Sequence, residues 1–433
     1  MCVYLAENHQ NKGYFLLEPT KMSAASIKIL HTADWHLGKR LEKFSRFDEQ
    51  RAVLAEICAI ADAQQVDVVI VAGDIFDQYN PPNEAIDLFY KTVKKLSNDG
   101  NRLVLCIAGN HDSPERISAP EPLARTAGVC LLGLPDSYIP PFVLESGLAL
   151  LRSEEGFLEF KLPKHNTPLR IIATPYANEL RLKKFLNFND DILLRAHLQT
   201  FWQNLADKYC DDKGVNLLVS HLFVIDEKDT NPPAEDDDKP ILIAGNAQAI
   251  FTQNFPSEMQ YVALGHMHRC YALSDNMPMV MYSGSPLQYS LSEAGQQKYV
   301  LVLQLTANEP PQIEKIPLSE GLPLVKKTFK QVDECVQWLN ENPNCYVEIE
   351  LVCAHYISAE ETKQIFEAHD KIVRIIPHIT AGAQATETSI SAKLEQLDIN
   401  EIFKEYFKSK TGKEADDTFL ALFNEIRNMS EDL

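Results

Sequence analysis

The sequence predicts an α/β protein with a layered main domain, a small α+β domain after it and a helical hairpin near its C-terminus. Apolar runs of strand type alternate with amphipathic helical segments over residues 27–291, as in a sheet covered by helices. After residue 295 this alternation changes, and later still apolar residues recur at helical spacing. With 433 residues, 45% of them hydrophobic, the chain has enough apolar material for two or three domains.

The main domain is predicted from short apolar runs that are bounded by polar clusters. The predicted strands are 27–31, 67–72, 103–108, 170–174, 215–220, 261–264 and 279–282. Amphipathic helices are predicted at 47–63 and 83–96, between the early strands. Because parallel strands end at one edge of their sheet, residues that follow these runs are expected to meet there.

The small α+β domain is expected over 295–379. Its predicted strands and helices are 298–305, 331–340 (helix), 346–352, 359–369 (helix) and 372–376. A stretch rich in Ala, Thr and Ser follows, so 380–395 is predicted to be a linker.

The last segment, 396–433, is predicted to form two amphipathic helices separated at Thr411-Gly412. Ile399, Ile402, Phe403 and Tyr406 lie on one face of the first helix. Such a hairpin either packs on its own protein or binds a partner. The preceding linker leaves it little core to share, which favours a partner.

Residues 1–26 are predicted to be a disordered extension, and we expect the functional protein to begin near Met22. This segment lacks the basic start and long apolar core of a secretory signal. Nine scattered cysteines without a C-x-x-C pair are typical of reduced thiols. No apolar stretch approaches the ~20 residues of a membrane span. The expected location is therefore the cytoplasm.

The net charge of −20 opposes the simplest picture of a nucleic-acid-binding protein, which is a basic surface that neutralises phosphates. Net charge is a sum, however, and bound divalent metals with a local basic stretch can create a positive path on an acidic protein. The acidic run 235–238 is interpreted as a solvated loop.

Five polar clusters follow the predicted strands and supply carboxylate, amide and imidazole side chains. They are D-W-H at 34–36, G-D-I-F-D at 73–77, G-N-H-D at 109–112, S-H at 220–221 and G-H-M-H at 265–268. Taken alone, a single histidine such as His221 is more often structural, and an aspartate after a strand is often a turn residue. Together the five clusters predict a site for two divalent ions, with Asp74 as the bridging anion. Six further histidines lack such neighbours and receive no function: His31, His165, His197, His355, His369 and His378.

The order D-x-H, GD-x-x-D, GNHD, H and GH-x-H resembles the calcineurin-like metallophosphoesterase superfamily. The wording "TADWHLGKR", "VIVAGDIFDQYNPPNEA", "IAGNHDSPERI", "ALGHMHR" and "YSGSPLQYSLSE" is similar to the SbcD family of bacterial nuclease subunits. The resemblance implies a metallophosphoesterase β-sandwich flanked by helices, a capping domain for DNA recognition at 295–379 and an ATPase-docking segment at 396–433.

The resemblance also implies a role for each residue of the clusters. The first metal would be held by Asp34, His36, Asp74 and His268, and the second by Asp74, Asn110, His221 and His266. His111 would be the catalytic histidine, and Asp77 and Asp112 are candidates to orient it. The implied activity is Mn²⁺-dependent hydrolysis of DNA by a metal-activated water. It includes exonuclease action on double strands and endonuclease action on single strands and hairpins.

DNA contacts are predicted from basic residues near the metal ligands: Lys39, Arg40, Lys43, Arg46, Arg116 and Arg269. For the run that begins at Lys39, a solvated helix face explains the pattern equally well. By family analogy, the implied assembly is a homodimer with contacts near 83–96 and 117–127, joined to an SbcC-like coiled-coil ATPase. It would act on DNA ends at the nucleoid, in repair, replication and recombination.

Other functions agree less well with the sequence. A small-molecule or cyclic-nucleotide phosphodiesterase uses the same centre but needs neither an extra domain nor terminal helices. Protein phosphatases of the superfamily carry Arg-Gly and Glu where this chain has Gln78-Tyr79 and Asp112. A non-catalytic scaffold disagrees with the complete set of predicted ligands.

Overall fold

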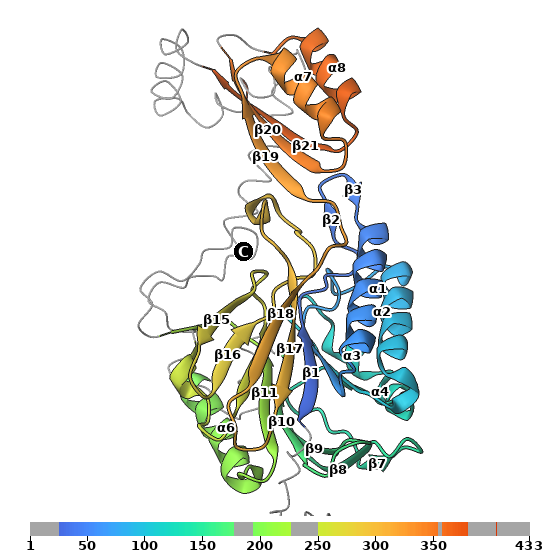
Figure 1. Cartoon of the computed structure of the whole chain (residues 1–433), viewed down its shortest axis with the longest axis vertical. Helices are drawn as coiled ribbons and strands as arrows, with labels where there is room; N and C mark the ends of the chain where they lie inside the picture. The colour runs from blue at the N-terminus through green and yellow to red at the C-terminus, as the bar shows by residue number, and fades with distance from the viewer. Residues whose placement is uncertain (1–25, 177–193, 227–249, 354–356, 380–403, 405–433) are drawn as a thin grey trace, which may run out of the picture. The chain divides into compact units, whose positions relative to one another are not determined.

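The computed structural model describes residues 26–176, 194–226, 250–353 and 357–379, together with Lys404. Most of the expected N-terminal extension, the linker at 380–395 and, apart from Lys404, the hairpin at 396–433 lie outside these residues. The chain divides into two compact units between Pro323 and Leu324 (Figure 1).

The first unit contains two large sheets. The six-stranded sheet has the order β18-β17-β1-β4-β5-β6. Its strands are β1 (Ile27–Thr32), β4 (Val68–Ala72), β5 (Leu103–Ile107), β6 (Val129–Leu132), β17 (Tyr299–Leu305) and β18 (Gln312–Pro317). β1, β4, β5 and β6 are parallel, whereas β17 pairs antiparallel with β1.

The eight-stranded sheet has the order β15-β16-β14-β11-β10-β9-β8-β7. Its strands are β7 (Phe142–Val143), β8 (Ala149–Glu154), β9 (Phe157–Lys161), β10 (Leu169–Thr174), β11 (Val215–His221), β14 (Tyr261–Gly265), β15 (Tyr271–Ser274) and β16 (Met279–Tyr282). β10, β11, β14 and β16 run parallel to one another. Two short pairs complete the unit: β2 (Arg40–Leu41) with β3 (Phe44–Ser45), and β12 (Val224–Ile225) with β13 (Ile250–Phe251).

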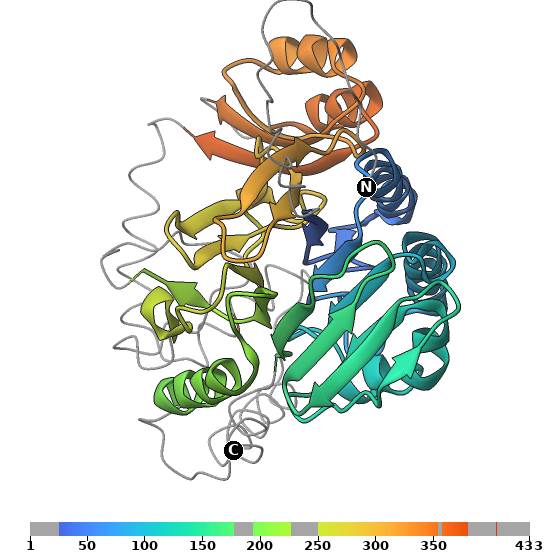
Figure 2. The ribbon, with the colours of Figure 1, turned by 60° about the horizontal axis from the view of Figure 1, so that its bottom comes forward.

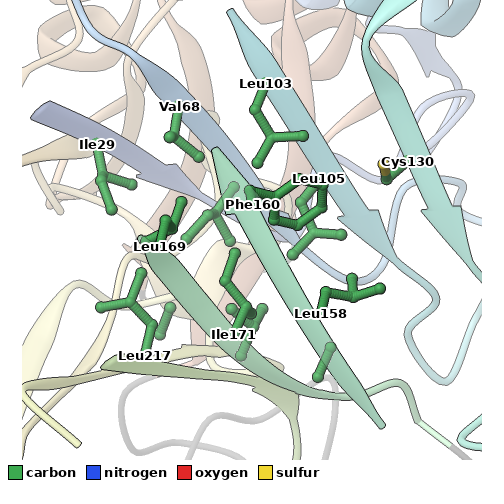
Figure 3. Packing of buried hydrophobic residues seen from close by; sticks show 14 of the residues in the cluster. Ile29, Val68, Leu103, Leu105, Cys130, Leu158, Phe160, Leu169, Ile171 and Leu217 are labelled. Atoms are coloured by element: carbon green, nitrogen blue, oxygen red, sulfur yellow. The ribbon is translucent and has the colours of Figure 1, made fainter. Parts of the chain in front are cut away.

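Alternation along the buried strands explains the layers. In β4, Val68 and Ile70 enter the core shared with the second sheet, while Val69 and Val71 face the helices. Figure 3 shows the shared core, in which Leu105 and Val68 lie near Phe160 and Leu169. The first unit is therefore a sandwich of two sheets with helices outside.

The outer layers are formed by a few helices. They are α1 (Phe47–Ala63), α2 (Asn83–Leu96), α3 (Pro114–Ser118), α4 (Glu121–Ala124) and α6 (Leu194–Tyr209). α1 and α2 cover the six-stranded sheet, and α6 covers the eight-stranded one (Figures 1 and 2). None of the helices in the described part of the chain combines the length and apolar character that crossing a bilayer requires. The eight described cysteines are free thiols.

The second unit is small. Its sheet has the parallel order β19-β20-β21, formed by β19 (Leu324–Phe329), β20 (Tyr346–Cys353) and β21 (Ile372–Ile379). Helices α7 (Val332–Glu341) and α8 (Ala359–Ala368) enclose its apolar core. The expected domain began at 295, but β17 and β18 belong to the first unit because Ile29 and Leu303 pair across β1 and β17. The second unit therefore begins at Leu324.

Candidate metal centre

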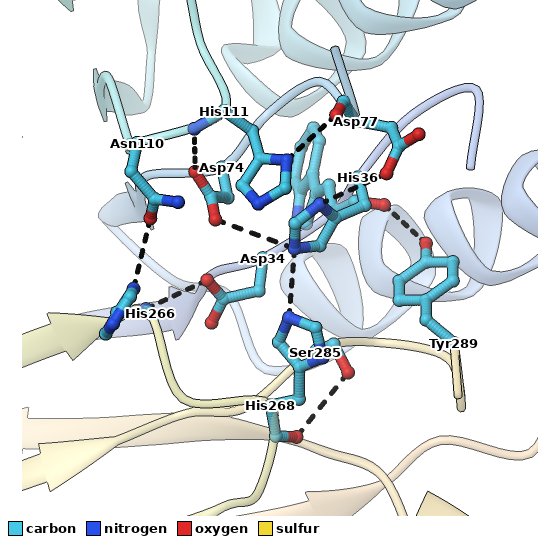
Figure 4. Close-up of polar contacts among 12 residues, drawn as sticks. Asp34, His36, Asp74, Asp77, Asn110, His111, His266, His268, Ser285 and Tyr289 are labelled. Atoms are coloured by element: carbon cyan, nitrogen blue, oxygen red, sulfur yellow. Dashed lines mark hydrogen bonds and ion pairs between the residues drawn. The ribbon is translucent and has the colours of Figure 1, made fainter. Parts of the chain in front are cut away.

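All five polar clusters lie at the carboxyl ends of parallel strands in the first unit. The clusters at 34–36, 73–77 and 109–112 follow β1, β4 and β5 of one sheet, and those at 220–221 and 265–268 end β11 and β14 of the other. The seven side chains Asp34, His36, Asp74, Asn110, His221, His266 and His268 converge there and are called the ligand cluster below (Figure 4).

The backbone of the ligand cluster is strained. Four of its non-glycine residues have positive φ: Asp34 (54°), His36 (43°), Asp74 (47°) and His266 (104°). Each departs from the region that L-residues prefer, and such residues gather at functional sites. Hydrogen bonds hold this arrangement, since Asp34 N donates to Gly73 O at 3.0 Å and His36 N donates to Asp74 O at 2.9 Å.

Asp74 lies between the two halves of the ligand cluster. Its Oδ2 is 3.6 Å from His36 Nε2 and 3.4 Å from His221 Nε2. Its Oδ1 accepts a hydrogen bond from His111 N at 2.9 Å. A carboxylate between two imidazole nitrogens has the position that a bridging ligand requires.

Asn110 and two histidines form one side of the cluster. Asn110 Oδ1 is 2.9 Å from His221 Nε2 and 3.0 Å from His266 Nδ1. The other nitrogen of His221, Nδ1, donates to Ala72 O at 2.9 Å. In the neutral ring, the Nε2 lone pair of His221 therefore faces the cluster, where a cation can take the place of a proton.

Asp34, His36 and His268 form the other side. His36 Nε2 and His268 Nε2 face each other at 3.0 Å. Asp34 Oδ1 accepts from His266 N at 2.9 Å, but Asp34 Oδ2 is buried and has no hydrogen-bond partner among the described residues. A buried carboxylate oxygen without a donor is costly unless a cation neutralises it.

The charges of the cluster favour a cation. Burial raises the pKa of Asp34 to about 7, and burial together with Asp74 raises the pKa of Asp112 to about 6. Burial alone would raise the pKa of Asp74 as well, but His221 and His36 lower it below its ordinary value. Burial would lower the pKa of His221, yet the Asp74 carboxylate raises it to about 9. Buried carboxylates that repel one another are stabilised by added positive charge.

The donor set fits divalent metal ions. Carboxylate oxygens, an amide oxygen and imidazole nitrogens suit Mn²⁺, Fe²⁺ or Zn²⁺. His36, Asp77 and His111 form one compact group of candidate ligands, and Asp34, Asp74 and His221 form another. Both groups lie in the first unit.

The predicted catalytic histidine, His111, lies beside the ligand cluster. Its ring centroid is 4.8 Å from that of His36. Its Nδ1 is 2.9 Å from the main-chain oxygen of Asp77, so Nδ1–H donates to this carbonyl. The predicted partner was the carboxylate of Asp77. The Asp77 carboxylate lies 3.8 Å from His36 Nδ1 and 3.7 Å from Lys39 Nζ.

Asp112, the other candidate to orient His111, contacts the backbone in the structure. Its carboxylate accepts from three backbone amides, those of Ile75 (3.0 Å), Phe76 (2.9 Å) and Gly109 (2.8 Å). These bonds join the loop after β4 to the loop after β5. Asp112 therefore fixes the loop that carries His111 through backbone amides.

One predicted DNA contact is wrong. Arg46 is 1% exposed, and its guanidinium binds the carboxylate of Glu49 and donates to Gln288 O at 2.8 Å. A guanidinium held in this way is a structural residue. The other five basic candidates differ, because Lys39 is partly buried beside Asp77 whereas Arg40, Lys43, Arg116 and Arg269 are exposed.

The sequence did not predict the residues that bind the backbone oxygens of the ligand cluster and its neighbours. Gln50 Nε2 donates to His36 O at 2.9 Å, and the hydroxyl of Tyr289 donates to Trp35 O. Ser285 N donates to His268 O at 3.1 Å, and Ser285 Oγ donates to the same oxygen at 3.4 Å, the contact drawn in Figure 4. Ser285 and Tyr289 lie in the run of small and polar residues at 282–293. This run is similar to the SbcD family sequence, but its composition did not indicate a chemical function for any of its residues.

The chain is similar in sequence to known proteins. The family model for calcineurin-like phosphoesterases matches residues 27–270, which is more than half of the chain. The chain belongs to the calcineurin-like phosphoesterase family and is a metal-dependent hydrolase of phosphate esters.

Similar proteins show which group of calcineurin-like phosphoesterases the chain belongs to. The chain is 33% identical to SbcD of the nuclease SbcCD from Bacillus subtilis, with 94% of this chain and 99% of the relative covered. It is 28% identical to the Escherichia coli K12 protein of the same name, over 76% of this chain and 79% of the relative. Within the phosphoesterases, it belongs with the SbcD proteins. A crystal structure of a dimetal phosphatase from Danio rerio is 16% identical, with a TM-score of 0.41 over 68% of this chain and 97% of that one.

Proposed function

We propose that this chain is a Mn²⁺-dependent DNA nuclease that cuts phosphodiester bonds with an SbcC-like ATPase. The proposed activities are exonuclease action on double strands and endonuclease action on single strands and hairpins, in DNA end processing, repair and recombination. The observation that carries the proposal is the position of Asp74 Oδ2 between His36 Nε2 and His221 Nε2. Support also comes from the relatives named as parts of the nuclease SbcCD.

Two metal ions are assigned to the ligand cluster. We propose Asp34, His36, Asp74 and His268 for one ion, and Asp74, Asn110, His221 and His266 for the other. When bound, the ions supply Lewis acidity toward the phosphoryl group and lower the pKa of a water molecule. The chain itself holds Asp74 between the two halves through the Gly73 turn and the bond from His111 N.

His111 is proposed to give a proton to the leaving oxygen. Because Asp77 O can only accept, His111 Nδ1 carries hydrogen, and Nε2 is the nitrogen assigned to the substrate. The imidazolium form then donates from Nε2 to the leaving oxygen and becomes neutral. Asp112 positions this histidine through the backbone amides that it binds.

The DNA backbone is proposed to approach over the basic residues near His111. Lys39, Arg40 and Lys43 follow the ligand His36 in the sequence, and Arg116 and Arg269 follow His111 and His268. Contacts of this kind bind phosphates without reading sequence, so salt should weaken them.

The remaining assignments concern the second unit and the partners. We propose that the second unit takes part in DNA recognition and that 396–433 binds the coiled-coil base of the ATPase. We also propose a homodimer through α2 and the segment 117–127, within a heterotetramer in the cytoplasm, at the nucleoid.

Deletion of 396–433 should release the ATPase without stopping Mn²⁺-dependent cleavage. Unchanged complex formation by the truncated chain, in a pull-down with the ATPase, would refute this assignment.

The test of the nuclease is cleavage of end-labelled duplex and hairpin DNA by the full chain with Mn²⁺, beside His111→Ala. We expect the variant to lose about 10²–10⁴-fold in rate while it still binds metal. His165→Ala is the matched control, because His165 is bonded to Asp67 at the opposite end of β4 from Asp74. Normal turnover by His111→Ala would refute the assigned histidine. Turnover of a generic phosphodiester alone, even with the ATPase present, would favour a small-molecule phosphodiesterase.

A further inference from the structure

A segment that follows β16, residues 283–298, holds His268 at both its backbone and its ring. Ser285 N and Lys298 Nζ donate to His268 O at 3.1 and 2.9 Å. On the ring, His268 Nδ1 is 3.2 Å from Glu293 Oε1. Glu293 is 2% exposed and Lys298 is 6% exposed, so these contacts are shielded from water.

Glu293 determines which nitrogen of His268 carries hydrogen. A carboxylate is an acceptor only, so His268 Nδ1 donates to Glu293 and Nε2 keeps its lone pair. That Nε2 is the atom that faces His36 Nε2 at 3.0 Å. Two imidazole nitrogens at this distance need a cation or a proton between them. Glu293 therefore turns the lone pair of His268 toward the ligand cluster.

Glu293 also has structural contacts, which give it a simpler explanation. Its Oε1 accepts from Tyr289 N and Ser290 N at 3.1 Å each, and the Ser290 contact completes a capping box at the short helix Leu291–Glu293. Its Oε2 binds the ammonium of Lys298. A capping box accepts glutamine as well as glutamate, so it does not by itself require a charge at this position.

We propose that Glu293 is a positioning residue of the metal centre, which fixes the tautomer and orientation of His268 and so sets the affinity of one of the two metal ions. This inference rests on the proposed function, because it takes His268 as a metal ligand. Carboxylates that bind the second nitrogen of a ligand histidine typically contribute 10–100-fold to metal affinity.

The test is Mn²⁺ binding by Glu293→Gln. The substitution keeps the shape and the capping box but replaces the carboxylate that faces His268. Calorimetric titration of the full chain should show one of two Mn²⁺ ions bound about 10–100-fold more weakly, with the other unchanged. The electron paramagnetic resonance spectrum at one to two equivalents of Mn²⁺ should change from that of a coupled pair to that of isolated ions.

Two further variants separate positioning from stability. Glu159→Gln is the matched control, since Glu159 is 9% exposed and paired with Arg170 at 2.9 Å, as Glu293 is paired with Lys298. It should leave both Mn²⁺ affinities unchanged. In Glu293→Gln with Lys298→Met the ion pair is removed as a whole, which is far less costly than leaving the ammonium unpaired. This double variant should fold and still bind one ion weakly.

The outcomes distinguish the two proposals. If the native chain binds fewer than two Mn²⁺ ions, the proposed two-metal centre fails, and the assignment of Glu293 fails with it. If the native chain binds two ions and Glu293→Gln binds both with native affinity, the assignment of Glu293 alone is overturned. Native affinity in the double variant would likewise overturn it, because the effect would then come from the unpaired Lys298.

Discussion

The two compact units both contain parallel strands and buried carboxylates, but Glu348 of the second unit and Asp34 of the first differ in their partners. In the second unit, Glu348 on β20 is 2% exposed and is bound by Arg374 Nε at 2.7 Å and approached by Lys326 Nζ at 3.4 Å. In the first unit, Asp34 Oδ2 is buried without a partner among the described residues. Parallel strands alone thus do not make a site.

The histidines of the two units also differ in what their ring nitrogens contact. Both ring nitrogens of His369 in the second unit are occupied, by Asn342 O at 3.1 Å and Lys371 N at 3.0 Å. The histidines of the ligand cluster point nitrogens at one another and at carboxylates. A metal centre is therefore recognised by buried nitrogens and carboxylates that face one another across a space where a cation would bind.

The largest effect is expected from Asp74→Asn. The amide keeps the shape of the side chain but removes the charge that lies between His36 and His221. We expect the loss of both metal ions and a fall in hydrolysis of a generic phosphodiester by about 10³-fold or more. Metal content after dialysis and the rate constant measure this. Glu348→Gln, the buried carboxylate of the second unit, is the control, and equal effects of the two substitutions would remove the contrast between the units.

A smaller effect is expected from Gly73→Ala. At Gly73 φ is +91°, and an added Cβ would lie 2.2 Å from His221 Nδ1. The methyl group must displace His221, so the metal ion assigned to His221 should be lost and stability should fall by roughly 2–4 kcal/mol. Gly147→Ala is the control, because φ is +89° there but the nearest atom lies 3.9 Å away. It should show the backbone strain alone. Equal losses for both variants would mean that the contact with His221 does not matter.

A third prediction concerns acid and the core between the sheets. Burial lowers the pKa of His31 from 6.5 to about 3. Between these values the unfolded chain binds one more proton, so the stability that a neutral His31 gives is present above pH 6.5 and decreases as the pH falls toward 3. At about pH 5 the loss is roughly 2 kcal/mol.

His31→Gln should remove this part of the acid sensitivity of the metal-free protein. Urea unfolding at about pH 7.5 and about pH 5 measures it, and the difference between the two free energies should be smaller by roughly 2 kcal/mol in the variant. An unchanged difference would show that His31 does not titrate across unfolding.

The sequence carries local information on strand ends and side-chain types, but not on which distant strands pair. Asp74 and His266 were placed in one predicted site because strand periodicity and ligand-type side chains coincide at each strand end. The predicted strand 298–305 was expected in the small domain, whereas β17 pairs with β1 of the first unit. An apolar run does not show which strand it pairs with, and this pairing is a long-range contact. Glu293 was missed for the same reason, since its contact with His268 spans 25 residues.

The smallest effect is expected from Glu348→Gln, measured now as stability. Arg374 and Lys326 are about half exposed, at 51% and 46%, so water and salt screen their charges. We expect a loss of about 1 kcal/mol at low salt, decreasing as salt is added, because Gln still accepts a hydrogen bond from Arg374. Urea unfolding at two salt concentrations tests it.

If the Glu348 carboxylate instead bound a cation, as is proposed for the ligand cluster, Mn²⁺ would stabilise the native chain more than the variant. If Mn²⁺ stabilised the native chain and Glu348→Gln equally, the metal centre would lie in the first unit alone.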